Sequence, residues 1–253
     1  MRQVVVALLL ALHCLPPALA QERRSGFEDM ARESQAMQRD DAANPGMLWV
    51  QEGEAIWSRP AGPEGRSCAS CHGAAETTMA GVATRYPAWD EASAAPIDLS
   101  GRIAQCREQR QHGPALARES EGLLALAAFI GLQSRAMPLA PPADGRLQST
   151  RTLGEELYRQ RRGQLDLSCA QCHDDNAGRR LAGSTIPQAH PTAYPRYRLE
   201  WQALGSLQRR LRGCMTGVRA EPFEYGAAEL IAIEAWLAQR AAGMAVETPG
   251  VRP

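Results

Sequence analysis

Two short segments share the pattern C-x-x-C-H: SCASCHG at 67–73 and SCAQCHD at 168–174. Two thiols three positions apart can add to the two vinyl groups of one haem, and the adjacent histidine can then bind the iron as its proximal ligand. The pattern therefore predicts two covalently bound c-type haems. The residues that would hold them are Cys68, Cys71 and His72, and Cys169, Cys172 and His173.

Three other uses of these cysteines are a four-cysteine zinc site, a pair of redox-active C-x-x-C motifs, and ordinary disulfides. A zinc site does not need a histidine after each second cysteine. A thioredoxin-like motif belongs in a βαβ pattern, which this sequence does not show. Two complete C-x-x-C-H motifs behind an export signal favour haem over all three.

Cys106 and Cys214 remain after haem attachment. They lie 34 and 41 residues beyond the haem histidines of their halves, before the last predicted helix of each half. In small cytochromes c the sixth iron ligand comes from this region and is usually methionine, so we expect a cysteine to be the distal ligand here. A disulfide between Cys106 and Cys214 is the main alternative. Other candidate ligands are worse placed or lack a counterpart in the other half: Met79, Met137, Met215, Met244, His112 and His190.

The segment RRLRGCMTGVRAEP, residues 209–222, surrounds Cys214 with arginines. Nearby positive charge favours the thiolate, which is the form that binds metal or acts as a nucleophile. The same charge would attract an anion to the sulfur. Cys106 also has arginines nearby, so pairing with haem propionates is an alternative role for any of them. The arginines are Arg209, Arg210, Arg212 and Arg219 near Cys214, and Arg102, Arg107 and Arg110 near Cys106.

An internal repeat positions these groups. The two haem motifs are 101 positions apart, and residues 53–57 (GEAIW) match residues 154–158 (GEELY) at the same offset. Residues 121–133 and 227–239 have apolar residues at i, i+3 and i+4 and predict an amphipathic helix at the end of each half. Between haem motif and last helix each half is rich in Gly, Pro and Arg, which predicts loops around the cofactor, and strand signals are scarce.

We therefore predict a mainly α fold of two tandem class I-like cytochrome c domains, at 45–140 and 141–253. The proline-rich segment 135–145 would form a stiff connection between them. Each half is small for a large hydrophobic core, so a buried haem would supply apolar contact area. Residues 21–44 are polar and charged and predict a loosely packed N-terminal extension.

The first twenty residues predict a secretory signal peptide, with one arginine, a short apolar run and Ala18-Leu19-Ala20 at its end. Cleavage near Ala20 would remove Cys14 and place the protein in the periplasm. The run from Val4 to Leu12 is too short for a membrane span, which needs about 20 apolar residues. The net charge is zero, with 28 acidic and 28 basic residues, which argues against a nucleic-acid partner.

These features resemble SoxA, the dihaem cytochrome subunit of the SoxAX complex, an L-cysteine S-thiosulfotransferase of bacterial thiosulfate oxidation. The resemblance covers essentially the mature chain. It rests on the two C-x-x-C-H motifs, on the later single cysteine of each half, and above all on RRLRGCMTGVRAEPF around Cys214. It implies His72 and Cys106 as axial ligands of haem 1, and His173 and Cys214 as those of haem 2.

The resemblance also implies chemistry. Cys214 would carry a persulfide as the catalytic intermediate, and Arg210 would bind the substrate. Thiosulfate would be joined to a cysteine of the carrier SoxYZ, and two electrons would leave through the monohaem subunit SoxX to a small cytochrome c. A dihaem electron-transfer cytochrome without chemistry of its own remains the alternative, and a dihaem oxidase that makes tetrathionate without a carrier is a third possibility.

Overall fold

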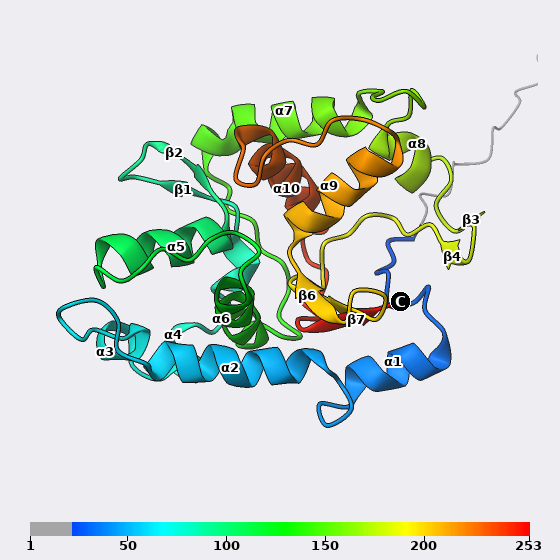
Figure 1. Ribbon diagram of the computed structural model, residues 1–253. Helices are drawn as coiled ribbons and strands as arrows, with labels where there is room; N and C mark the ends of the chain where they lie inside the picture. The colour runs from blue at the N-terminus through cyan, green and yellow to red at the C-terminus, as the bar shows by residue number, and fades with distance from the viewer. Residues whose placement is uncertain (1–21) are drawn as a thin grey trace, which may run out of the picture.

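A computed structural model describes residues 22–253 (Figure 1), so the predicted signal peptide and Cys14 lie outside the described residues. The fold is mainly α, as predicted. The first half contains α2 (Gly46–Ser58), α3 (Cys68–His72), α4 (Ala75–Thr78), β1 (Ala88–Asp90), β2 (Ala95–Ile97), α5 (Leu99–Gln109) and α6 (Glu121–Leu132). The second half contains α7 (Gln148–Arg159), α8 (Cys169–His173), β3 (Arg180–Leu181), β4 (Ser184–Thr185), β5 (Arg196–Arg198), β6 (Ala203–Gly205), α9 (Leu207–Gly217), α10 (Ala228–Arg240) and β7 (Gly250–Arg252). Two 3₁₀ turns, η1 (Ala83–Arg85) and η2 (Gly145–Leu147), complete the order.

Each half is built around one close helix pair, α2 with α6 and α7 with α10 (Figure 1). The repeated glycines lie at the two contacts. A Cβ at Gly53 would lie 2.2 Å from the carbonyl oxygen of Ala125, and one at Gly154 would lie 2.0 Å from that of Ala232. No side chain fits between these backbones, which explains why both copies of the repeat begin with glycine.

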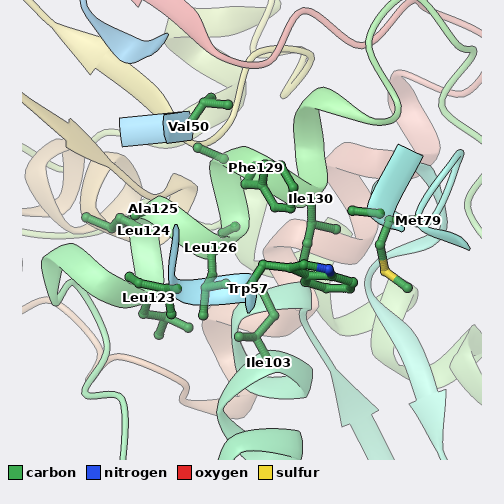
Figure 2. Close-up of a cluster of buried hydrophobic side chains, with 14 of the residues drawn as sticks. Val50, Trp57, Met79, Ile103, Leu123, Leu124, Ala125, Leu126, Phe129 and Ile130 are labelled. Atoms are coloured by element: carbon green, nitrogen blue, oxygen red, sulfur yellow. The ribbon is translucent and has the colours of Figure 1, made fainter. Parts of the chain in front are cut away.

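The two predicted terminal helices are present as α6 and α10, but neither is amphipathic in the structure. In α6 every residue from Leu123 to Gly131 is buried, and in α10 most residues from Leu230 to Ala238 are buried. A helix that is buried on all sides lies at the centre of its domain rather than on its surface. Figure 2 shows α6 residues packed with Val50 and Trp57 of α2 and with Ile103 of α5.

The segments predicted as loops contain two further helices, α5 and α9. Each begins at a side-chain cap: Asp98 accepts a hydrogen bond from the Gly101 N–H, and Ser206 accepts one from the Arg209 N–H. Capping of this kind stabilises a helix start by about 1 kcal/mol. A short antiparallel hairpin precedes each helix, β1–β2 before α5 and β5–β6 before α9.

The two halves are joined by a buried polar cluster at the starts of α5 and α9. Arg118 donates to both oxygens of Asp98, at 2.7 and 2.8 Å, and Gln208 donates to Asp98 at 3.4 Å. Glu234 of α10 is buried beside them and is only 8% exposed. Both helices that carry the remaining cysteines are therefore anchored in one network.

Residues 22–44 are packed in place, which corrects the expectation of a loose extension. They include α1 (Arg32–Arg39), which contacts β7, and β7 in turn pairs in parallel with β5. Gln38 accepts a hydrogen bond from the Val251 N–H at 2.9 Å, and Asn44 donates to the Pro249 carbonyl at 3.0 Å. The extension thus covers the edge of the three-stranded sheet. Across residues 22–253, no helix is long and apolar enough to cross a membrane.

Candidate functional site

The two C-x-x-C-H motifs form short helices of the same design, α3 and α8. Ser67 and Ser168 cap them, and in both the residue at the third helical position bonds back to the cap, which completes a capping box. In a helix the first cysteine and the histidine, four positions on, lie on one face. The serine before each motif therefore has a structural role that the haem signature alone does not reveal.

An aromatic side chain from the neighbouring helix anchors the residue that follows each histidine. Trp57 donates through Nε1 to the carbonyl of Gly73 at 3.1 Å. Tyr158, at the matching repeat position, donates to Asp174 at 2.8 Å, and Arg240 donates to the same oxygen at 2.8 Å. The repeat residues Trp57 and Tyr158 thus fix the position of the histidines relative to the helix pairs.

The imidazole of His173 is oriented for ligation. Its Nδ1 lies 2.6 Å from the carbonyl oxygen of Pro187. A carbonyl can only accept, so Nδ1 carries a proton, and Nε2 is left to contact Cys214 or to bind a metal. His72 has an exposed side chain and packs 5.7 Å from the Trp57 ring, measured between ring centroids.

Cys106 and Cys214 occupy equivalent places, each the eighth residue of its helix, α5 or α9. Cys106 is close enough to Cys68 and Cys71 for their charges to interact, and Cys214 interacts in the same way with Cys169 and Cys172. All six cysteines of residues 22–253 are unpaired, so the alternative of a Cys106–Cys214 disulfide is wrong.

Cys214 is electrostatically unlike the other cysteines. Burial raises the pKa of Cys68, Cys106 and Cys172, and that of Cys169 to about 11. At Cys214 burial also acts to raise the pKa, but a hydrogen bond with His173 and the positive charges of Arg210 and Arg196 outweigh it, and the pKa is lowered. The site therefore favours a thiolate at Cys214.

The donor sets fit c-type haem. Each half offers two unpaired thiols and a histidine on one short helix, with a further thiol on a helix facing it. Buried guanidinium atoms without partners, such as Arg107 Nε and Arg162 Nη1, suit the haem carboxylates. Within residues 22–253 no three His, Cys, Asp or Glu side chains converge as a protein-only metal site would require.

The alternative ligands have other surroundings. Met79 and Met215 belong to the apolar cores of the two halves, and Met244 packs in a small third cluster. Met137 is 39% exposed. His190 bonds through Nδ1 to the carbonyl of Arg24 at 2.7 Å, and His112 is an exposed neighbour of Glu64.

The four arginines near Cys214 differ in what they contact. Arg209 stacks 4.1 Å from the Trp201 ring, and Arg212 stacks 4.4 Å from the Tyr225 ring and donates to the Phe223 carbonyl. Arg219 is exposed, beyond the end of α9. Arg210 forms no ion pair within residues 22–253, and its charge interacts first of all with Cys214.

Sequence reasoning missed Arg196, Arg198 and Tyr194, which the fold brings to this site from β5 and the residues before it. Arg196 and Arg210 both act on Cys214, and Tyr194 interacts with both arginines. The repeat offset of the haem motifs does not align these residues with the first half, because the loop between haem motif and hairpin is longer in the second half.

A family model described as SoxA/TsdA, cytochrome c domain, matches the chain twice, at residues 52–139 and 153–246. The chain is 38% identical to the L-cysteine S-thiosulfotransferase subunit SoxA of Rhodovulum sulfidophilum, over 91% of this chain and 80% of that protein. It is also 38% identical to the protein of that name from Pseudaminobacter salicylatoxidans, over 91% and 81%. The crystal structure of SoxXA from P. pantotrophus matches with a TM-score of 0.88 and 33% identity, covering 91% of this chain and 87% of that one.

Proposed function

This chain belongs to the SoxA/TsdA family of cytochrome c domains, and we propose that it is the catalytic subunit of an L-cysteine S-thiosulfotransferase. It would join thiosulfate to a cysteine thiol of the carrier SoxYZ. One S–S bond forms between the thiol sulfur and the sulfane sulfur, and the products are the cysteine S-thiosulfonate, one proton and two electrons. The protein would act in the periplasm as a heterodimer with a SoxX-type cytochrome.

Cys214 is the proposed nucleophile. The positive charges of Arg210 and Arg196 favour the anionic form of its sulfur, which is the reactive form. In the first step the outer sulfur of a persulfide carried on Cys214 bonds to the sulfane sulfur of thiosulfate, and two electrons leave. In the second step the carrier thiolate attacks that sulfane sulfur and displaces the Cys214 persulfide anion, so the enzyme returns to its starting state. Covalent catalysis of this kind divides one difficult transfer into two easier ones.

Arg210 is the proposed binding group for the oxygens of thiosulfate. It lies one helical turn before Cys214 on α9, so both side chains are on one face of the helix. No carboxylate within residues 22–253 pairs with it, which leaves its guanidinium available for charge-assisted hydrogen bonds to an anion.

The two haems would be held at Cys68, Cys71 and His72 with Cys106, and at Cys169, Cys172 and His173 with Cys214. When bound, they would supply the redox chemistry by which the two electrons leave toward the haem of the partner and a small cytochrome c. The protein orients the second site through the Pro187 carbonyl, which holds His173, and through Tyr158 and Asp174.

The observation that carries this proposal is the contrast between the two distal cysteines. Both occupy the eighth position of a capped helix beside a C-x-x-C-H motif, yet the arginine one turn earlier is paired with Asp90 in the first half and, within residues 22–253, has no ion pair in the second. Two equivalent ligands would suffice for an electron carrier. An activated thiol beside an unpaired arginine favours sulfur chemistry at the second site.

The test replaces Cys214 by Ser in the purified heterodimer, with Thr216→Ala, an exposed residue of the same helix, as control. Carrier-dependent reduction of cytochrome c by thiosulfate should fall by at least about a thousandfold in Cys214→Ser and stay unchanged in the control. Mass spectrometry should find both haems attached in each variant. Near-normal turnover of Cys214→Ser, or turnover of the unmodified enzyme without carrier, would contradict the proposal.

A further inference from the structure

The two halves correspond residue by residue along the hairpin and helix that carry each distal cysteine. β1, β2 and α5 have the same lengths as β5, β6 and α9, and each first-half element lies 108 positions before its counterpart. At this offset Cys106 corresponds to Cys214 and Arg102 to Arg210. The hairpin residues that correspond are Ala88 with Arg196 and Asp90 with Arg198.

In the first half the arginine one turn before the cysteine is neutralised by a carboxylate of the same half. Arg102 donates to Asp90 at 2.7 Å, and Gln105 donates to the other carboxylate oxygen at 2.9 Å. Ser93 completes the shell with its hydroxyl at 2.7 Å. These hydrogen bonds hold the pKa of Asp90 well below its usual range, so its carboxylate stays charged beside Arg102.

In the second half the equivalent strand, β5, carries arginines at the positions of Ala88 and Asp90. Arg198 replaces the carboxylate of Asp90, and it is itself paired with Glu200. Arg196 replaces the methyl of Ala88. Its guanidinium lies 4.5 Å from the centre of the Tyr194 ring, and its Nε is buried without a hydrogen-bond partner. Within residues 22–253, Arg196 forms no ion pair.

Three further arginines lie close enough to act on the charge of Arg196, and two of them, Arg198 and Arg252, are paired with Glu200 and Glu247. Arg252, Arg210 and Arg198 all act against its charge, and with burial they lower the pKa of Arg196 to about 10. Burying a cation beside other cations is costly unless an anion joins them. A small dianion placed between Arg196 and Arg210 would remove that cost, and the two guanidiniums would offer it two sets of donors.

We propose that Arg196 is a second binding group for the thiosulfate dianion, which it holds together with Arg210 beside Cys214. The change of Ala88 and Asp90 to Arg196 and Arg198 then explains why one of two similar sites is catalytic: the first neutralises its own arginine, and the second leaves two arginines for substrate. This inference rests on the proposed function, because it assigns a role in binding its substrate.

A haem propionate is an anion of similar chemistry and would be the other partner for Arg196. The two roles differ in what they affect. A propionate contact supports the cofactor, so its loss changes the haem midpoint potential, the absorption spectrum or the haem content. A substrate contact made equally before and during reaction changes KM and the dissociation constant while kcat is conserved.

The experiment uses the oxidised holoprotein in complex with its cytochrome partner, and measures thiosulfate binding by calorimetry without carrier and then KM and kcat with carrier. Arg196→Ala installs the residue found at the equivalent first-half position. Arg196→Lys keeps the charge but loses the two-pronged geometry. Arg159→Ala, which removes an exposed arginine of α7, is the control for loss of one positive charge.

Arg196→Ala should raise the dissociation constant and KM by about 10- to 100-fold, with kcat within about threefold of the unmodified enzyme. Arg196→Lys should raise the dissociation constant and KM by a smaller factor than Arg196→Ala does. Arg159→Ala should have the dissociation constant and KM of the unmodified enzyme. Haem content, spectrum and potentials should be unchanged in all three. Unchanged thiosulfate binding in Arg196→Ala, with or without a shifted haem potential, overturns the inference while leaving the proposed function intact. Absence of carrier-dependent turnover in the unmodified complex overturns both.

Discussion

The close contact of α2 and α6 makes Gly53 a position where one methyl group should be costly. A Cβ there would lie 2.2 Å from the carbonyl oxygen of Ala125 and 2.7 Å from Cβ of Phe129. The carbonyl is backbone and cannot rotate away, so the helices would have to separate. Overpacking costs about 1–3 kcal/mol, and a backbone contact this short is at the upper end of that range.

Gly53→Ala should therefore lower the free energy of unfolding by about 2 kcal/mol, since the better helix propensity of Ala returns about 1 kcal/mol of the cost. For a chain of this size each kcal/mol corresponds to about 2–4 °C in Tm, which gives a decrease of about 4–8 °C. Differential scanning calorimetry of the holoprotein measures it.

Gly122→Ala is the matched control, because Gly122 lies in α6 itself. Its nearest contacts would be ordinary, 3.5 Å to Ile56 Cδ1 and 3.7 Å to Leu116 Cδ2. This variant should melt at the temperature of the unmodified protein or slightly above it. If Gly53→Ala melts as high as Gly122→Ala, the helices are not in the close contact described here, and the structural reason for glycine in both repeats is refuted.

Two further predictions concern a buried carboxyl and a buried hydroxyl. Burial raises the pKa of Glu234, so its contribution to stability is present at low pH and is lost as pH rises through the native pKa. Glu234→Gln should flatten this decline, which urea titrations from pH 4 to 9 would show as a weaker dependence of the free energy of unfolding on pH. Parallel curves for the variant and the unmodified protein would contradict the prediction. The groups that face Glu234 are Asp98, Arg118, Gln208 and Glu119. Tyr158→Phe removes the hydrogen bond to Asp174 and should lower the free energy of unfolding by about 1 kcal/mol, measured by urea denaturation. Trp57→Phe removes the bond to Gly73 and also leaves a cavity in the core, so its effect should be larger. An unchanged stability in both variants would show that these bonds do not anchor the haem motifs.

Local patterns predicted much of this molecule. The C-x-x-C-H motifs, the terminal helices at 121–133 and 227–239, and the mainly α class follow from spacing and periodicity, which act over a few residues. The helices α5 and α9 were missed because their apolar stripes are narrow: in α9 only Leu207, Leu211 and Met215 recur at helical spacing, among five polar or charged residues. Their caps, Asp98 and Ser206, are signals of a helix start that apolar periodicity alone does not contain.

The polar cluster at the domain interface could not be read from the sequence, since Gln208 and Asp98 are 110 positions apart and meet only in the folded chain. Arg196 was missed for a different reason. It lies 18 residues before Cys214, and only alignment of the two halves through their hairpins shows that it stands where the first half has alanine. The offset of 101 between haem motifs hides this correspondence, because the hairpins are 108 positions apart.

The two halves share one framework and differ in the charged residues around the distal cysteine. Both keep the glycine contact between helices, the aromatic anchor after the haem histidine and the capped helix with arginine one turn before cysteine. Those features would position a haem and its ligands in each half. In the first half Asp90 neutralises Arg102 through an ion pair. In the second half Arg196 and Arg210 have no ion pair within residues 22–253. A half-buried charge without an ion pair is costly to a folded protein, so the presence of two beside Cys214 is best explained by an anion that binds there.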